Sequence, residues 1–174
     1  WLSDEEIRQG QRLLEQLPDK AGTPPIALHP YATHPDKAWK EAYWRQLVEL
    51  FESRGIPWIV IGRGSGMEGI PASRNFTNRT SLRETCALLK SSSLLITGDS
   101  GPMHLAGAVG TPVLALFGPT TEEWGFFPAG PKDRVLESQL DCRPCTLHGK
   151  KHCDRNHACM QSITPEQVMR ALDE

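Results

Sequence analysis

Residues 96–110 of the chain read ITGDSGPMHLAGAVG, and this stretch decides the fold. An apolar run at 94–97 stops at Gly-Asp-Ser-Gly-Pro, and a helix-like pattern begins at once at Pro102. Small residues and a proline at such a junction are typical of a strand that turns directly into a helix. The stretch therefore predicts one strand–turn–helix unit of an α/β protein.

Strand and helix patterns alternate on both sides of this unit. Strands are predicted at 26–30, 57–62, 94–97, 112–117 and 134–137, with a further short candidate at 75–78. Helices are predicted at 3–17, 38–54, 81–91 and 102–109, and a last one begins at Thr164-Pro165. Continuous apolar strands are typical of parallel sheets covered on both faces. We therefore expect an α/β fold with a Rossmann-like, doubly wound parallel sheet.

The N-terminal residues differ in character from the rest of the chain. Ser3-Asp4-Glu5-Glu6 is a capping box that starts the first helix, and residues 18–25 read as a linker. Because the chain starts at Trp1, directly on this helix, we interpret it as a piece of a longer protein, with residues 1–25 as a linker helix and connection. Residues 26–174 then form the Rossmann-like domain, with a cysteine-rich segment at 141–159.

The bulk composition argues against several classes of function. With 174 residues, 39% of them hydrophobic, the chain suits one globular domain with a sizeable core. A formal net charge of −2 gives no sign of a nucleic-acid partner. The sequence contains no run of 18 apolar residues, so it predicts no membrane span, and we recognise no secretory signal in it.

The turn before the central helix is a candidate anion site. Asp99 or Ser100 can cap the helix, and Gly101 lets a ligand approach the backbone closely. Pro102 stands where its missing N–H has no cost. The helix N-terminus then offers free N–H groups and about half a positive charge, with His104 in the first turn. Purely structural caps would give the same local pattern, so both interpretations stay open.

A second candidate for binding an anion follows the first strand. Thr33 stands four residues before Lys37 in a proline-rich loop that precedes a helix. A lysine there can hold a diphosphate as a point charge. A solvated loop lysine is the more ordinary interpretation of such a residue.

Three other motifs carry less weight. Residues 64–69 match the dinucleotide fingerprint GxGxxG, but Ile70-Pro71 follows where that fingerprint needs a helix. The remaining interpretation of residues 64–69 is a flexible loop near a ligand. The GDSGP sequence at 98–102 is close to a serine-protease motif but lacks one glycine and a partnered base. The Asn-x-Thr patterns at 75–77 and 78–80 are read as chance matches to the glycosylation pattern.

Four of the five cysteines fall in one segment, where they form a candidate metal site. Cys142 and Cys145 have the C-x2-C spacing of a metal knuckle, and Cys153 and Cys159 follow at gaps of seven and five residues. His148, His152 and His157 are spare ligands. Without a secretory signal, a structural zinc ion or free thiols are favoured over disulfides. Cys86 lies on the apolar face of its helix and is assigned to the core.

The chain resembles glycosyltransferase family 9, the bacterial ADP-heptose:lipopolysaccharide heptosyltransferases. The residues that carry this resemblance are DKAW at 36–39, the stretch from Thr80 to Gly125, and the tail ending in CMQSITPEQVMRAL. Gly107 replaces the first alanine of the family's usual pair. The resemblance implies a GT-B fold, in which two Rossmann-like domains face each other, with this chain as the C-terminal, nucleotide-sugar-binding domain.

The resemblance also implies roles for individual residues. It places Lys37 and Thr33 at the diphosphate, the backbone of Ser100 and Gly101 at the phosphates, and Asp99 and His104 near phosphate and sugar. It places Thr80 against the adenine and Glu68 at the ribose. The family is inverting and uses no metal or other cofactor in catalysis. Its presumed base is an aspartate of the N-terminal domain, so the catalytic residue of this protein is unknown from the chain.

The leading hypothesis is therefore half of an enzyme. The chain would be the ADP-sugar-binding domain of an inverting heptosyltransferase, which transfers heptose from ADP-heptose to a lipid-linked acceptor of the lipopolysaccharide core. It would be cytoplasmic, in peripheral contact with the inner membrane, and inactive without the N-terminal domain. Two alternatives stay open: a non-catalytic binding module organised by the cysteine-rich metal site, and half of a nucleotide-sugar epimerase.

Overall fold

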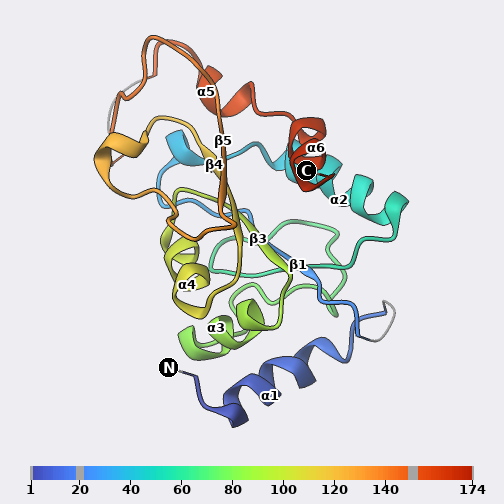
Figure 1. The fold of residues 1–174 in the computed structure, drawn as a ribbon. Coiled ribbons are helices and arrows are strands. Elements are labelled where there is room, and N and C mark those ends of the chain that lie inside the picture. Colours follow the sequence, from blue (N-terminus) through green and yellow to red (C-terminus); the bar gives the residue numbers. More distant parts are fainter. Residues whose placement is uncertain (1, 19–21, 149–152, 174) are drawn as a thin grey trace.

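A single parallel sheet forms the centre of the molecule (Figure 1). The computed structural model describes residues 2–18, 22–148 and 153–173. The strands are β1 (Ile26–His29), β2 (Trp58–Val60), β3 (Leu94–Gly98), β4 (Val113–Phe117) and β5 (Arg134–Glu137), in the order β2-β1-β3-β4-β5. All four neighbouring pairs are parallel, as the continuous apolar runs predicted. The candidate strand at 75–78 is reduced to one bridge, between Asn75 and Val60.

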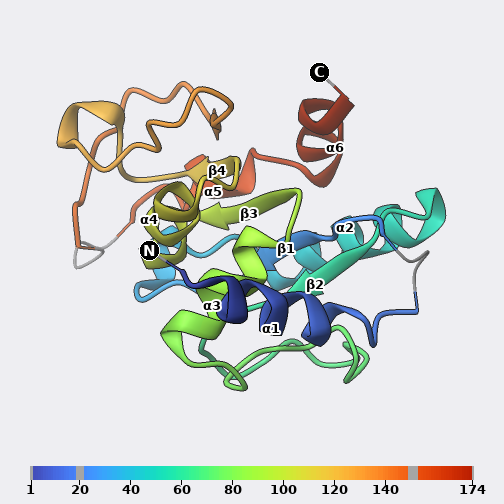
Figure 2. The same ribbon diagram turned by 60° about the horizontal axis from the view of Figure 1, so that its bottom comes forward.

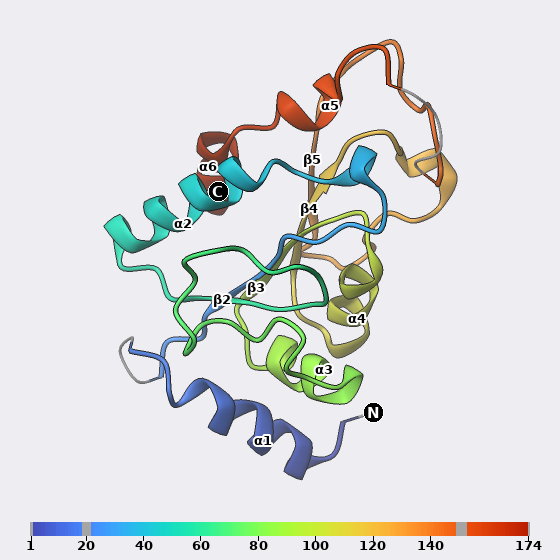
Figure 3. The same ribbon diagram turned by 180° about the vertical axis from the view of Figure 1, so that it is seen from behind.

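Helices cover both faces of the sheet, which confirms the doubly wound architecture. The helices are α1 (Asp4–Leu14), α2 (Glu41–Arg54), α3 (Leu82–Lys90), α4 (Gly101–Val109), α5 (Ala158–Gln161) and α6 (Pro165–Asp173). Two 3₁₀ turns, η1 (Pro35–Lys37) and η2 (Glu122–Trp124), interrupt the loops. Figure 3 shows α2 beside α6 on one face, and α3 lies beside α4 on the other. No helix among the described residues is long and apolar enough to cross a membrane.

Each face of the sheet has its own apolar core. On one face, strand residues such as Ile59 and Leu95 pack with Leu88 and Leu89 of α3 and with α4. On the other face, Trp44, Leu47 and Phe51 of α2 pack with Val168 and Met169 of α6 and with the alternate strand residues. Burial of β1 and β4 is complete along their length, so neither face of these strands meets water.

The first helix forms an outer layer over α3 (Figure 2). Its predicted capping box between Ser3 and Glu6 is present. A Cβ atom added at Gly10 would lie 2.7 Å from the main chain of Ala87, so glycine is what allows the two helices to approach so closely. The helix ends at Leu14 rather than at Leu17, because residues 15–17 form a turn that leads into Pro18.

The second helix begins three residues later than predicted. Pro35 starts the 3₁₀ turn η1 instead, and the backbone at Ala38 is extended. The Trp39 indole is buried and donates a hydrogen bond of 2.8 Å to the carbonyl of Ile163, which anchors the extended segment. The turn brings Lys37 over the end of β3, where a Cβ atom at Gly98 would lie 3.3 Å from the Lys37 carbonyl oxygen.

The strand order defines where a ligand site is expected. The chain runs from β1 outward to β2 and then returns to β3 on the other side of β1. The carboxyl ends of β1 and β3 therefore flank the topological switch point, where open α/β sheets bind their ligands.

Candidate functional site

A cavity of about 420 Å³ lies at this switch point. Its walls come from the end of β1, the loops after β1 and β2, the turn between β3 and α4, and the beginnings of α3 and α4. The residues that line it are His29, Tyr31, Ala32, Thr33, Gly62, Arg63, Thr80, Leu82, Thr85, Ser100, Gly101, Pro102 and Leu105. The cavity is therefore mixed in character: Ser100 and three threonines are polar, whereas Leu82 of α3 and Leu105 in the second turn of α4 are apolar.

The N-terminus of α4 opens into this cavity without a side-chain cap. Ser100 is the N-cap residue, but its side chain makes no capping hydrogen bond to the helix. Its hydroxyl lies instead 2.9 Å from Thr97 Oγ1 and 3.2 Å from His29 Nδ1. Nothing lies within 4 Å of a Cβ atom placed at Gly101. Pro102 has no N–H group, and the Met103 N–H donates to the Ser100 carbonyl at 3.1 Å. The open backbone at Gly101 is therefore where an anion can approach this helix N-terminus.

His29 lies beneath this helix N-terminus and was not singled out from the sequence. Its ring is 6% exposed, and Nδ1 lies 3.0 Å from Thr97 Oγ1. Burial lowers the pKa of His29 to about 4, so the ring is neutral at pH 7. It contributes hydrogen bonds rather than charge. A histidine that ends an apolar strand was the signal available in the sequence.

We expect acid to destabilise the fold partly through His29. Its pKa is about 4 in the folded chain, against the usual 6.5. Between these values the unfolded chain binds a proton that the folded chain does not, so the free energy of unfolding falls as the pH falls from 6.5 towards 4. Because one pKa unit corresponds to about 1.4 kcal/mol, His29 contributes at most about that much per pH unit.

Urea unfolding at pH 7 and pH 5 measures this contribution when wild type and a His29→Gln variant are compared. Glutamine keeps a side-chain amide for Thr97 and Ser100 but binds no proton in this range. The variant should lose less stability between the two pH values than the wild type. Parallel losses in the two proteins would show that His29 has no part in the acid sensitivity.

Lys37 and Asp99, both predicted from the sequence, meet beside the cavity. Lys37 Nζ lies 2.5 Å from Asp99 Oδ2, and the two side chains are 14% and 9% exposed. The hydroxyl of Thr120 donates to the same carboxylate oxygen at 2.9 Å. An ammonium group has three protons, so Lys37 can bond to Asp99 and still offer donors to an anion. Thr120 was missed, although it belongs to the Phe-Gly-Pro-Thr turn at 117–120.

The other predicted residues fall into two groups. Thr33, Thr80, Ser100 and Gly101 line the cavity, and Thr80 Oγ1 lies 2.9 Å from the hydroxyl of Thr85. Glu68 and His104 are exposed and do not line it. On α4 the neighbouring residue, Leu105, faces the cavity instead of His104. The helical rotation between adjacent positions places the two side chains in different directions.

The glycine-rich loop after β2 packs against the end of β1. A Cβ atom at Gly62 would lie 2.5 Å from the His29 ring, and one at Gly64 would collide with the Tyr31 ring. These glycines therefore allow the loop to approach two cavity residues. No helix forms within residues 61–80, so the GxGxxG sequence is not a dinucleotide fingerprint, as its following proline predicted.

The four clustered cysteines line a second pocket, of about 320 Å³. All are free thiols, and the N–H of His157 lies 3.2 Å from Cys153 Sγ. Burial, and to a smaller extent Cys145 and Cys153 nearby, raise the pKa of Cys159. Within the described residues, no group of three or more side chains is placed so that it could hold a metal ion. His152 lies outside the described residues.

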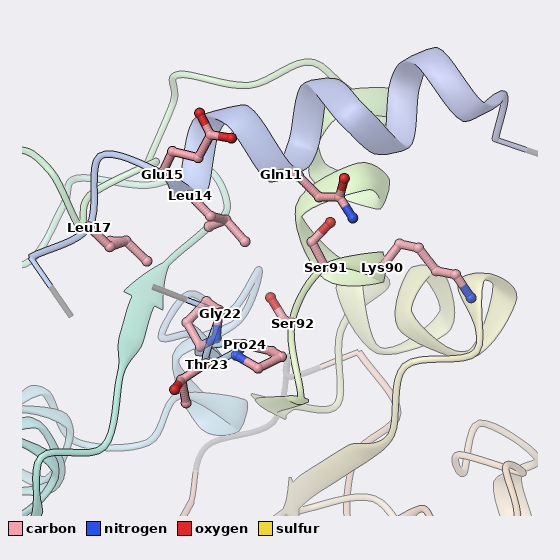
Figure 4. A pocket seen from close by; sticks show the side chains of 11 residues that line it. Gln11, Leu14, Glu15, Leu17, Gly22, Thr23, Pro24, Lys90, Ser91 and Ser92 are labelled. Atoms are coloured by element: carbon pink, nitrogen blue, oxygen red, sulfur yellow. The ribbon is translucent and has the colours of Figure 1, made fainter. Parts of the chain in front are cut away.

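A third and larger pocket, of about 610 Å³, lies at the opposite end of the strands, where the chain enters β1 and β3 (Figure 4). It is bounded by the end of α1, the end of α3 and the segment that enters β1. Lys90 at its rim donates a hydrogen bond of 3.0 Å to the carbonyl of Val109. None of the predicted binding residues lines this pocket. Because ligands of doubly wound sheets bind outside the carboxyl ends of the strands, the cavity at the switch point is the candidate site.

The fold and the site together define the class of protein. A parallel sheet ordered β2-β1-β3-β4-β5 is a doubly wound α/β domain, and the uncapped helix N-terminus at its switch point is a candidate anion site. The profile described as glycosyltransferase family 9 (heptosyltransferase) matches residues 3–154. The chain therefore belongs to glycosyltransferase family 9.

Two curated relatives illustrate the extent of the match. Lipopolysaccharide heptosyltransferase 1 of Pseudomonas aeruginosa is 35% identical over 153 residues, which cover 80% of this chain and 40% of that protein. Lipooligosaccharide heptosyltransferase 2 of Campylobacter jejuni is 26% identical over 171 residues, which cover 88% of this chain and 52% of that protein. The chain thus spans about half, or less, of the length of these relatives.

Solved structures share the fold. The glycosyltransferase of family 9 from Veillonella parvula superposes with a TM-score of 0.79 at 23% identity, over 99% of this chain and 52% of that one. The iron-containing dodecameric glycosyltransferase TibC of enterotoxigenic Escherichia coli gives a TM-score of 0.70 at 24% identity, over 90% and 46%. Escherichia coli heptosyltransferase WaaC with ADP gives 0.66 at 20% identity, over 94% and 48%. The parallel α/β architecture is common to all of them.

Proposed function

We propose that this chain is the nucleotide-sugar-binding half of an inverting heptosyltransferase, the C-terminal half of a GT-B fold. Its substrate would be ADP-heptose, and the acceptor a lipid-linked saccharide of the bacterial lipopolysaccharide core. The observation that carries this proposal is the uncapped N-terminus of α4 beside the Lys37–Asp99 pair, at the switch point of a family 9 sheet.

In this proposal the diphosphate lies across the first turn of α4. The N–H groups at Ser100 and Gly101 would bond to its oxygens, and Lys37 would add the donors that Asp99 does not use. The adenine would lie against Thr80 and the apolar side chain of Leu82, on the α3 side of the cavity. Thr33 would border the diphosphate from the other wall.

Glu68 and His104 have supporting roles in this proposal. Both side chains are exposed outside the cavity lining. They would therefore meet only the parts of the ligand that extend beyond the cavity, the ribose for Glu68 and the heptose for His104.

The same groups would assist the transfer step. When the acceptor hydroxyl displaces ADP from the anomeric carbon, negative charge develops on the departing diphosphate. Preorganised N–H donors and an ammonium group stabilise that charge, and no metal ion is needed for this role. The base that takes the proton of the acceptor hydroxyl would come from the other half of the enzyme.

The length of the relatives supports the proposed division of the protein. The chain spans about half of them, or less, which leaves room for the acceptor site and the base in residues outside it. Residues 1–25, with α1, would connect the two domains, and residues 26–174 would form the nucleotide-sugar domain. We place the whole enzyme in the cytoplasm, at the inner face of the inner membrane where a lipid-linked acceptor is found.

Calorimetric titration of the chain with ADP tests this proposal. We expect binding in the micromolar to millimolar range, about −8 to −4 kcal/mol, because the contacts to the second domain are lacking. GDP, which differs from ADP in its base, is the matched control for binding of the adenine. Inorganic phosphate is the control for anion binding at the helix N-terminus alone. Absence of heat and of chemical-shift changes at millimolar ADP would remove the proposal.

We also propose a structural zinc ion at the cysteine-lined pocket, held by Cys142, Cys145, Cys153 and Cys159. The donor set fits: four free thiols line one pocket, and soft thiolates in this number suit tetrahedral zinc. Binding would require the thiols to move into ligand distance, and it would release their protons. The ion would link the chain segments on either side of residues 149–152 and would take no part in the transfer.

Elemental analysis of protein purified without chelator, combined with thiol titration, decides whether this site exists. We expect one zinc ion per chain and four protected thiols that chelator releases. Iron in the same ratio would keep the site and correct the metal. Metal-free protein with four reactive thiols would exclude the site, and metal-free protein whose thiols appear only after reduction would point to disulfides.

A further inference from the structure

Arg143 lies between two of the clustered cysteines and bonds to the loop that follows β4. Its side chain is 4% exposed although it carries a full charge. The guanidinium group donates to four carbonyl oxygens and to one carboxylate: those of Phe117, Gly118, Thr120, Ser138 and Glu137. Such a planar fork holds several acceptors in fixed directions, which a lysine cannot do.

One of these acceptors leads directly to the proposed diphosphate site. The main-chain oxygen of Thr120 accepts from Arg143 at 2.9 Å, and the hydroxyl of the same residue donates to Asp99 at 2.9 Å. Asp99 in turn holds Lys37 at 2.5 Å. Arg143 therefore fixes the backbone of the residue that orients the carboxylate partner of Lys37.

A second contact adjoins the Lys37–Asp99 ion pair, next to Lys37. His157 Nε2 lies 2.6 Å from Asp36 Oδ1, and Asp36 directly precedes Lys37 in η1. The Asp36 side chain is 14% exposed and that of His157 is 35% exposed, so this contact is only partly shielded from water. His157 precedes α5, whose Met160 is buried under the β4 end at Gly118.

We infer that Arg143 and His157 are positioning residues for nucleotide binding, which hold the Asp99 and Lys37 sides of the ion pair respectively. Neither touches the ligand in this account: each acts through a neighbour, Thr120 for Arg143 and Asp36 for His157. The ammonium group of Lys37 would otherwise have the freedom of a four-carbon side chain. The inference rests on the proposed function, because it assigns both residues to the binding of the diphosphate.

The test compares ADP with adenosine on the 174-residue chain. Arg143→Gln should weaken ADP binding by about fivefold or more, the scale of one lost hydrogen bond, and leave adenosine within about twofold. Arg143→Lys should fall between wild type and Arg143→Gln, because lysine keeps the charge and part of the donor set. Arg155→Gln, at an exposed position of the same region, removes the same charge and should change neither affinity.

A double-mutant cycle separates positioning from general loss of stability. In a Lys37→Ala background, Arg143→Gln should cost no further ADP affinity, because the group that it positions is gone. Equal losses for ADP and adenosine, or additive losses in the double variant, would overturn the inference. His157→Gln provides the same comparison on a contact nearer the surface, should Arg143→Gln fail to fold.

A nucleotide-free measurement keeps this test distinct from that of the proposed function. The ammonium signal of Lys37 in a ¹H–¹⁵N spectrum should be observable in the wild type and in Arg155→Gln, because Asp99 holds the group in place. It should broaden or shift in Arg143→Gln and in His157→Gln. An unchanged signal in all variants would exclude positioning, whether or not the chain binds ADP.

Discussion

A Lys37→Ala variant should bind ADP about 5- to 150-fold more weakly than the wild type and bind adenosine almost equally well. The side chain meets no part of the base in the proposed complex, so only ligands with phosphates lose contacts. Hydrogen bonds to charged groups contribute about 1–3 kcal/mol each, which gives the expected range. Calorimetric titration of both proteins with the two ligands measures the difference.

The ion pair complicates this substitution in a way that can be controlled. Among the described residues, removing Lys37 leaves Asp99 with the hydroxyl of Thr120, and a carboxylate without a cationic partner would then face the incoming diphosphate. A Lys37→Ala/Asp99→Asn double variant removes this repulsion and should recover part of the affinity for ADP. Lys132→Ala, an exposed lysine in the loop before β5, is the matched control. Equal weakening of ADP and adenosine by Lys37→Ala would assign Lys37 a structural role.

The sheet and its helices could be predicted from the sequence because they depend on local patterns. The runs at 26–29 and 113–117 are apolar on both faces, which only a sheet covered on both sides can bury. The sequence from Gly98 to Pro102, with Ser100 as N-cap and the proline inside the first turn of α4, likewise specifies the strand–helix turn in a few consecutive residues. The place where a ligand is expected then follows from the parallel topology.

The groups that complete the candidate site could not be predicted in this way, because their contacts join distant residues. His29 and Ser100 meet only when β1 and β3 pair. Arg143 reaches Thr120 across 23 positions of the chain, and His157 reaches Asp36 across 121. No periodicity or spacing encodes such pairs. The start of α2 was placed too early for a related reason, since Trp39 is held in an extended segment by Ile163 of a different element.

The orientation of single side chains was also beyond the local pattern. His104 lies in the first turn of α4, as predicted, but its side chain is exposed and Leu105 lines the cavity. A helix turns by about 100° per residue, so the direction of each side chain depends on how the helix packs against the sheet. Met103, Ala106 and Val109 are the buried face of α4, and they set that rotation.

Under the proposed function, transfer of heptose should require the N-terminal half of the enzyme as well as this chain. We expect the 174-residue chain alone to give no transfer product from ADP-heptose and a lipopolysaccharide core acceptor, with or without Mg²⁺. Addition of the N-terminal half of the same protein, as a separate chain or in fusion, should restore turnover. Mass spectrometry of the acceptor measures the product, and incubation of ADP-heptose without protein controls for spontaneous hydrolysis.

The expected effect is all-or-none because two large contributions to the rate, the base and the orientation of the acceptor, are lost together. A positioned base contributes about 10²- to 10⁴-fold, and orientation of the acceptor hydroxyl against the anomeric carbon contributes effective molarities of about 10⁵–10⁸ M. The chain would retain only its donors to the departing diphosphate, at the α4 N-terminus and Lys37. These donors stabilise a charge that forms only once an acceptor attacks, so they cannot start the reaction by themselves. Turnover by the chain alone, above the rate without protein, would show that the base lies within these 174 residues and would overturn the half-enzyme proposal.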